Sequence, residues 1–191
     1  GTGSNSTRES IEMSQAAKKV GADGLLLVTP YYNKPSQEGM YRHFKAVIQA
    51  VPLPTVLYNV PGRTGCDMLP DTLARLCELP EVVAIKEATG SALRVSQIVA
   101  KTGDRLAVLS GDDANAFPAF ALGGKGVISV VSNGAPREFS AMWDAAAAGD
   151  CNKARELHYK CRSLSEGLFV EANPVPVKAA LARTGRMADE L

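Results

Sequence analysis

The stretch Val82-Val83-Ala84-Ile85-Lys86-Glu87 decides how the rest of the chain is interpreted. Its continuous apolar run is typical of a strand that is covered on both faces of a parallel sheet. Successive side chains of a strand point to opposite faces, so Val82, Ala84 and Lys86 share one face. Glu87 points to the other face and is a weaker candidate for chemistry. The pattern therefore predicts a lysine amine at the carboxyl end of a buried strand, above an apolar wall.

Similar apolar runs alternate with helical segments along the chain. The other runs that we interpret as strands are residues 22–30, 54–60, 105–110 and 126–131. The helical candidates lie at residues 6–20, 36–50, 69–78, 91–102 and 113–122. Strands that alternate with helices through short connections predict an α/β fold with a parallel sheet and right-handed crossovers.

Two architectures fit this order of elements. Five strands do not close a (β/α)8 barrel, which normally needs about 250 residues, so an incomplete barrel and an open doubly wound sheet both remain. Gly1-Thr2-Gly3 resembles the end of a further strand. After residue 131 the apolar periodicity is helical only. We therefore divide the chain into an α/β part at residues 1–131 and a helical segment at residues 132–191.

The composition argues against several classes of protein. Lysine and arginine number 21 against 20 aspartates and glutamates, a net charge of +1. This balance argues against nucleic acid or an anionic membrane as the main partner. No apolar stretch approaches the roughly 18 residues of a membrane span, and the N-terminus has no secretory leader.

The cysteines indicate a reducing compartment. They are Cys66, Cys77, Cys151 and Cys161. None forms a C-x-x-C pair, and only two histidines accompany them. We therefore expect buried thiols in a cytoplasmic protein and no zinc site.

Lys86 is the first candidate for chemistry. At the mouth of a barrel, burial disfavours the charged amine and lowers its pKa, which frees the neutral form to attack a carbonyl. The alternative is a lysine that extends into solvent from a strand end. Tyr58 ends the preceding strand about 5 Å away, where its phenol would shuttle protons beside the amine. The alternative for Tyr58 is a core tyrosine whose hydroxyl bonds a backbone group.

Three other segments at strand ends carry candidate groups. Arg63 lies in a Pro/Gly-rich loop at residues 61–65, which suits bidentate binding of a carboxylate, although a lone loop arginine is more often solvated. Tyr31-Tyr32 predicts a lid or subunit contact, or packing under the next helix. Asp112-Asp113 offers two carboxylates for Mg²⁺, but capping of the next helix is the favoured interpretation.

Three motifs follow one another at the ends of adjacent strands. They are residues 58–65 (Tyr-Asn-Val-Pro-Gly-Arg-Thr-Gly), residues 83–90 (Val-Ala-Ile-Lys-Glu-Ala-Thr-Gly) and residues 109–113 (Leu-Ser-Gly-Asp-Asp). Together they resemble the dihydrodipicolinate synthase family, in the N-acetylneuraminate lyase superfamily of class I aldolases. The likeness extends over essentially the whole chain. It implies a (β/α)8 TIM barrel, in which residues 1–131 form the part from about the third βα unit onward.

The resemblance also implies an activity. It is that of a cytoplasmic, homotetrameric lyase of lysine biosynthesis, which condenses pyruvate with L-aspartate-4-semialdehyde without metal or organic cofactor. Lys86 would form a Schiff base with pyruvate, Tyr58 would relay protons, and Tyr32 would reach into a neighbouring subunit's site. The substrate-binding positions that it implies are Arg63, Gly111 and Ile128.

Feedback inhibition by lysine is a further implication of the resemblance. Asn5, Glu9 and Tyr31 match part of the interface site at which regulated family members bind lysine. Glu9 would pair with the ammonium group of that ligand. Ordinary polarity in the first turn of a helix explains Asn5 and Glu9 without any ligand, and this alternative stays open.

One departure from the family keeps alternative functions open. The family's Gly-Thr-Thr-Gly-Glu loop, which binds the pyruvate carboxylate and supplies a relay threonine, is absent from residues 1–191, as is its last helical region. The alternatives are a pyruvate aldolase acting on a sugar acid such as N-acetylneuraminate, and a non-catalytic partial barrel. The Gly-Arg-Thr-Gly loop favours the synthase, because a fixed arginine suits a small dicarboxylate-forming substrate.

Overall fold

The computed structural model describes residues 1–190. Its sheet is parallel throughout, with the strands side by side in sequence order. The strands are β1 (Leu25–Val28), β2 (Thr55–Asn59), β3 (Val82–Glu87), β4 (Ala107–Ser110) and β5 (Gly126–Val127). This order excludes the doubly wound alternative, in which the strand order reverses. Beside β1, the N–H of Thr2 donates to the carbonyl oxygen of Leu26 at 3.1 Å.

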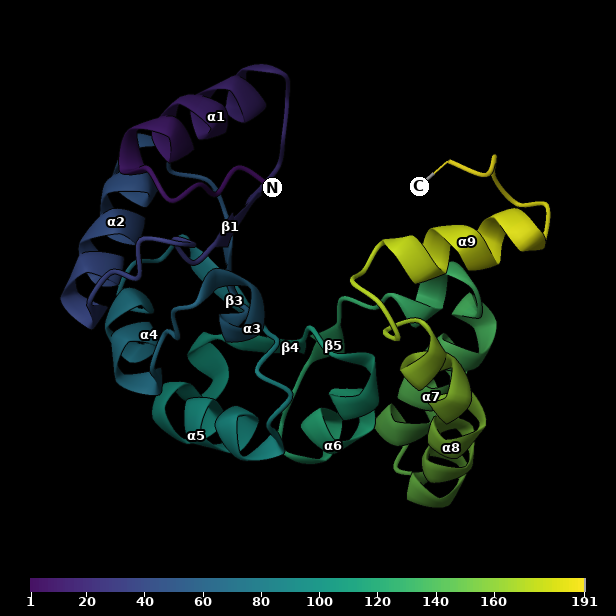
Figure 1. Cartoon of the computed structure of the whole chain (residues 1–191). Coiled ribbons are helices and arrows are strands. Elements are labelled where there is room, and N and C mark those ends of the chain that lie inside the picture. The colour runs from purple at the N-terminus through teal and green to yellow at the C-terminus, as the bar shows by residue number, and fades with distance from the viewer. Residues whose placement is uncertain (191) are drawn as a thin grey trace.

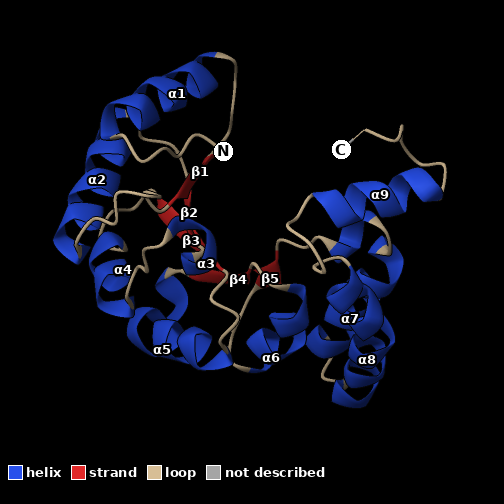
Figure 2. Cartoon of the chain, viewed as in Figure 1, coloured by secondary structure: helices blue, strands red, loops and turns tan. Residues whose placement is uncertain are grey.

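Helices connect and cover these strands. They are α1 (Thr7–Lys19), α2 (Gln37–Ala50), α3 (Pro61–Thr64), α4 (Pro70–Leu76), α5 (Ala92–Thr102) and α6 (Ala116–Ala121). Short 3-10 turns lie at η1 (Gly103–Arg105), η2 (Asp113–Asn115) and η3 (Val131–Asn133). Except for the short α3, these helices follow one another along an arc outside the curved sheet (Figures 1 and 2). The arrangement is that of an open segment of a barrel.

Residues suited to helix ends cap two of these helices. Ser36 is the N-cap of α2, where its side chain accepts a hydrogen bond from the N–H of Gly39. Such a bond satisfies one of the free N–H groups of a first turn. Gly103 ends α5 with a φ of +54°, a conformation that side chains with a Cβ rarely adopt.

The alternation predicted for β3 is confirmed by the strand register for Ala84 and Lys86, but it was wrong for Val82. Val82 pairs with Thr55 and belongs to the helix-covered core, because the register between β2 and β3 shifts by one residue before Ala84. One register row on the helix-covered face consists of Leu27, Leu57, Ile85 and Val108, each at most 1% exposed. The next row faces the inside of the barrel and consists of Val28, Tyr58, Lys86 and Leu109, all half-buried. The main core therefore lies between the sheet and the helices, and Lys86 points away from it.

The chain after β5 is helical. Its helices are α7 (Pro136–Ala147), α8 (Cys151–Gly167) and α9 (Val175–Arg183). They share a second apolar core with the end of the sheet, to which Val131, Phe139, Met142, Leu157 and Cys161 contribute. Figure 1 shows α7 and α8 beside α6, with α9 crossing them toward the C-terminus. Within residues 1–190, no helix combines the length and apolar character needed to cross a membrane.

Three further expectations about local structure were wrong. The predicted strand at 126–131 ends at Val127, because the carboxylate of Asp113 accepts hydrogen bonds from the N–H groups of Val130 and Val131. The expected loop at 61–65 contains the one-turn helix α3, since proline at its start presets φ and Gly65 closes it with a left-handed cap. Cys151 is exposed at the first position of α8, Cys77 is half-buried, and only Cys66 and Cys161 are buried.

Candidate active site

A cavity of about 430 Å³ opens at the carboxyl ends of the strands. Its lining comes from β2, α3, β3, the segment after β4, and the C-terminal helices. Residues from these elements include Tyr58, Arg63, Lys86, Gly111, Phe169 and Asn173. The strand ends of a barrel are where catalytic groups gather in this fold. The structure thus brings together four residues that the sequence singled out separately.

Lys86 and Tyr58 lie side by side in the wall of this cavity. They stand opposite each other in the ladder between β2 and β3. The Nζ atom of Lys86 lies 4.3 Å from the centroid of the Tyr58 ring, within the range of an attraction between a cation and an aromatic face. The predicted pair of amine and phenol on one face of the sheet is therefore confirmed.

The surroundings of Lys86 favour its neutral form. Burial lowers the pKa of the Lys86 amine, the positive charge of Arg63 lowers it further, and the carboxylate of Asp113 opposes both. Burial also raises the pKa of the Tyr58 phenol, against the influence of Arg63. An amine that loses its proton more readily can attack a carbonyl carbon. A phenol that keeps its proton can donate it to a developing oxyanion.

Gly111 leaves room for the lysine side chain. A Cβ built at this position would lie 2.8 Å from the Cβ of Ala88 and 3.0 Å from both Cγ and Cε of Lys86. Carbon atoms pack at about 3.5–4.0 Å, so any larger residue would push the amine out of place. Gly111 therefore contributes by the absence of a side chain, which the sequence alone did not reveal.

Arg63 lies at the rim of the cavity on α3. Its Nη2 atom donates to the carbonyl oxygen of Asn173, which is 110 positions away in the sequence, at 3.1 Å. This bond ties the end of β2 to the segment between α8 and α9. The remaining N–H groups of the exposed guanidinium are available to an anionic ligand.

Two other predicted site residues lie outside the centre of this cavity. The N–H of Ile128 donates to the carbonyl oxygen of Ser110 at 2.8 Å, and its side chain is 37% exposed. Val130, two positions later, lines the cavity. Tyr32 has a φ of +72° and an 88% exposed side chain. It lies on the surface of this chain, while its N–H is held by the carbonyl oxygen of Thr64 at 3.0 Å.

The residues matched to a lysine site come together on the surface. Asn5 donates through Nδ2 to the carbonyl oxygen of Tyr31 at 3.1 Å and accepts from Asn33 at 3.0 Å. Glu9 lies in the first turn of α1, where its carboxylate accepts from the hydroxyl of Ser4 at 2.8 Å. These contacts place the groups near one another and are compatible both with ligand binding and with the ordinary polarity of a first helical turn.

The two adjacent aspartates have different partners. Asp112 caps η2 by accepting from the N–H of Ala114 at 3.0 Å, as expected for a cap. Asp113 is buried and accepts from the N–H groups of Val130 and Val131 at 2.9 and 3.2 Å. Their carboxylates therefore bond different segments of the chain. No group of three or more acidic, histidine or cysteine side chains within residues 1–190 converges on a common point.

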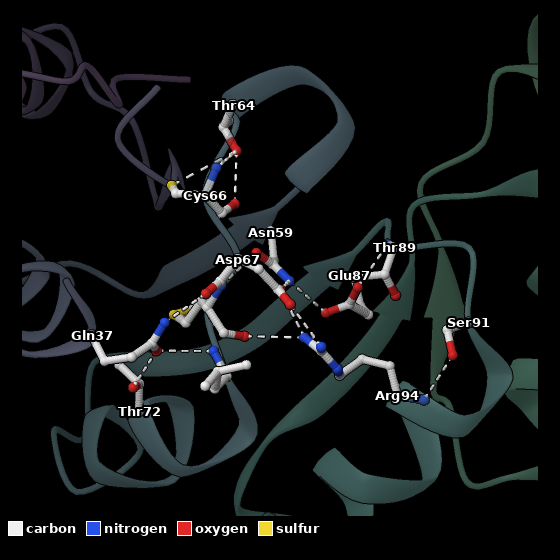
Figure 3. Close-up of polar contacts among 12 residues, drawn as sticks. Gln37, Asn59, Thr64, Cys66, Asp67, Thr72, Glu87, Thr89, Ser91 and Arg94 are labelled. Carbon is white, nitrogen blue, oxygen red and sulfur yellow. Dashed lines mark hydrogen bonds and ion pairs between the residues drawn. The ribbon is translucent and has the colours of Figure 1, made fainter. Parts of the chain in front are cut away.

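A buried polar network behind the strand ends was not predicted. It connects Asn59, Asp67, Glu87 and Arg94 on the helix-covered face of the sheet (Figure 3). The sequence indicates Glu87 only as a weak candidate and Asn59 only as part of a motif. Their hydrogen-bond partners come from distant segments of the chain. The only indication of the network in the sequence is that a polar residue ends each of two apolar strands.

The perturbed amine can be tested directly. We expect competitive acetylation of Lys86, followed by peptide mass mapping, to reach half its maximal rate at a pH below 10.5. In Arg63→Gln the midpoint should move to higher pH, because a positive charge that disfavours the ammonium form is removed. N-acetyl-lysine amide in the same tube is the reference. A midpoint at or above that of the reference would contradict the site's electrostatics.

The whole chain, residues 1–191, matches the model of the dihydrodipicolinate synthetase family. It is 58% identical over 191 residues to the 4-hydroxy-tetrahydrodipicolinate synthases of Geotalea daltonii and Pelobacter propionicus. These alignments include 100% of this chain and 66% of the length of each relative.

Solved structures give the same result. Dihydrodipicolinate synthase from Aquifex aeolicus superposes with a TM-score of 0.97 at 47% identity, covering 100% of this chain and 66% of that one. An enzyme of the same family from Cyanidioschyzon merolae, described with lysine bound, has a TM-score of 0.94 at 45% identity, covering 97% and 63%. The chain thus spans slightly less than two thirds of the length of these relatives. With its parallel β/α segment and its amine and phenol at the strand ends, the chain belongs to the dihydrodipicolinate synthetase family.

Proposed function

We propose that the protein condenses pyruvate with L-aspartate-4-semialdehyde to give 4-hydroxy-tetrahydrodipicolinate, a step of lysine biosynthesis through diaminopimelate. The observation that carries the proposal is the half-buried Lys86 amine, 4.3 Å from the ring of Tyr58, in a cavity rimmed by Arg63. The names of the relatives support the choice of substrates. No cofactor is needed, because the imine itself withdraws electrons from the carbon that reacts.

The chemistry begins with the neutral amine of Lys86. Its lone pair attacks the keto carbon of pyruvate, and loss of water gives an imine. The methyl carbon of pyruvate then loses a proton to form an enamine, which adds to the aldehyde carbon of the second substrate and forms the new carbon–carbon bond. The amino group of that substrate attacks the imine carbon, closes the ring and releases Lys86.

Tyr58 and Arg63 have separate roles in this scheme. The phenol of Tyr58 gives a proton to the carbinolamine oxygen, which leaves as water, and accepts protons in later steps. Arg63 binds the carboxylate of the semialdehyde through its free N–H groups. The backbone around Gly111 and Ile128 borders the substrates. Tyr32 acts in the site of a neighbouring subunit of a homotetramer. Its side chain is exposed on the surface of this chain, as a contact with another subunit requires.

Borohydride trapping tests the proposed nucleophile. Incubation of the whole protein with pyruvate and borohydride should give a stable adduct that peptide mapping assigns to Lys86. Lys86→Arg should give none, and Tyr58→Phe should slow trapping by about 10²- to 10⁴-fold, the usual contribution of a general acid or base. Lys160→Arg, on the exposed face of α8, is the matched control. An adduct in Lys86→Arg equal to that of the wild type would refute the assignment.

The second substrate is tested through Arg63. Arg63→Lys keeps the charge but loses the planar fork, so we expect KM for L-aspartate-4-semialdehyde to rise about tenfold or more, as for a lost charge-assisted hydrogen bond. Trapping of pyruvate should change little. Arg137→Lys, at an exposed position outside the cavity, provides the control. Turnover of N-acetylneuraminate in place of the semialdehyde would favour the sugar-acid aldolase, and trapping without any turnover would favour a non-catalytic barrel.

Feedback inhibition by L-lysine is also proposed, with the site formed by Asn5, Glu9 and Tyr31. The bond from Asn5 to Tyr31 and the relative described with lysine bound support it. Glu9→Gln should raise the lysine concentration needed for half-maximal inhibition, because the carboxylate that pairs with the ligand's ammonium is lost. Glu12→Gln on the same helix is the control. Absence of inhibition in the wild-type protein at millimolar lysine would refute the lysine site and leave Glu9 as an ordinary acidic residue of a first helical turn.

A further inference from the structure

A row of buried polar side chains lies directly behind the reactive pair. Asn59, Glu87 and Ser110 are neighbours in the strand register and are 0%, 4% and 2% exposed. They follow immediately after the row that holds Tyr58 and Lys86, and they point to the opposite face of the sheet. The preceding row on their own face is entirely apolar. Because burial of polar groups costs free energy unless they are bonded, the change to polar residues here calls for an explanation.

Asn59 and Glu87 clamp the two strand ends together. Nδ2 of Asn59 donates to Oε2 of Glu87 at 3.1 Å and to Oδ1 of Asp67 at 2.9 Å. Oδ1 of Asn59 accepts from the N–H of Met68 at 3.0 Å. Oε1 of Glu87 accepts from the N–H of Thr89 at 2.7 Å. Both polar atoms of the Asn59 amide and both oxygens of the Glu87 carboxylate are therefore hydrogen-bonded, which fixes the orientation of the two side chains.

The clamp is anchored to three helices. Asp67, between α3 and α4, accepts from both terminal nitrogens of Arg94 on α5, at 2.8 and 2.7 Å. Gln37 on α2 donates to the carbonyl oxygen of Asp67 at 2.7 Å and accepts from the hydroxyl of Thr72 on α4 at 2.6 Å. Figure 3 shows these groups as one connected set. The same segment follows α3, so the network also holds the element that carries Arg63.

None of these network residues lines the 430 Å³ cavity. They do not line the space that a substrate would occupy, and the charges that shift the pKa of Lys86 are those of Arg63 and Asp113. We therefore look for their influence on the chemistry in the backbone of the strand ends. Burial raises the pKa of the Glu87 carboxyl, against the hydrogen bonds from Asn59 and Thr89. Ile85 on the same face of β3 is apolar and fully buried, so packing alone does not require a carboxylate at this position.

We propose that Glu87 is a positioning residue, which with Asn59 fixes the carboxyl ends of β2 and β3 so that the Lys86 amine stays beside the Tyr58 phenol. This inference rests on the proposed function and assigns a role to residues outside the cavity. Fully bonded polar networks rigidify the structure around them. A displacement of about 1 Å in a reacting group can cost about 100-fold in rate.

Glu87→Gln is the decisive variant because it is nearly isosteric. Glu87 accepts from two donors, the amide of Asn59 and the N–H of Thr89, whereas glutamine offers one acceptor and one NH₂ group. One donor must then face another donor. Rotation of the Asn59 amide would not relieve this, because it would break the bonds to Met68 and Asp67. The variant therefore opens one end of the clamp.

The test measures the rate of pyruvate trapping by borohydride as a function of pH in the whole protein. In Glu87→Gln we expect the rate to fall about 10- to 100-fold, with the rising limb of the pH profile displaced to higher pH as the amine becomes more solvated. Ile85→Val, which shortens the adjacent side chain on the same face, should keep the wild-type rate and limb. Circular dichroism shows whether each variant is folded. A folded Glu87→Gln with the wild-type rate and pH limb would overturn the proposal.

If Glu87→Gln does not fold, a second variant still tests the proposal. Arg94→Lys keeps a charge beside Asp67, which is partly exposed, but cannot keep both bonds. It should displace the pH limb in the same direction, and an unchanged limb would overturn the proposal. If wild-type protein forms no adduct at Lys86, the proposed function fails and the positioning role fails with it. If only the variants behave like wild type, the proposed function stands and the positioning role alone is refuted.

Discussion

In the ladder between β2 and β3, Tyr58 stands opposite Lys86, and one step later Asn59 stands opposite Glu87. Because side chains alternate along a strand, this register sends the first pair into the barrel and the second toward the helices. A shift of one residue in either strand would place its member of each pair on the wrong face. The local geometry of the reactive centre therefore depends on the pairing of these two strands.

The environment of the amine follows from that placement. The floor of the site is the apolar inner face of the sheet, and burial there is the main reason that the pKa of Lys86 is lowered. Arg63 also lowers the pKa of Lys86, whereas Asp113 raises it. The segments that follow β2 and β4 therefore have opposite effects on the charge of the amine. Asp113 has a second effect, because its bonds to Val130 and Val131 end β5 and shape the cavity wall. Electrostatics and backbone geometry are thus set by the same few groups.

Much of the fold could be predicted because its signals are local. The bounds of β3 match the apolar run at 82–87, and period-two alternation correctly places Ala84 and Lys86 on the face that Tyr58 shares. The one-turn helix α3 is a local exception, since its proline and glycine also fit the loop that was expected. The other features that the sequence missed at the sheet depend on partners distant in sequence. The end of β5 is imposed by a carboxylate from the preceding strand end, and the polar network joins residues from four separate segments. The role of Gly111 could not be predicted either, because it depends on the side chain of Lys86 lying against the position that a Cβ would occupy.

The pairing of the Lys86 amine with the Tyr58 phenol would be visible in a crystal structure of the whole protein after borohydride reduction with pyruvate. We expect continuous density from the Nζ atom of Lys86 to the former keto carbon. We also expect the Tyr58 hydroxyl within hydrogen-bond reach of the adduct, about 2.6–3.2 Å from an acceptor or donor atom. Density on a different lysine, or a Tyr58 ring turned away from an adduct on Lys86, would contradict the pairing of amine and phenol from which the mechanism is built.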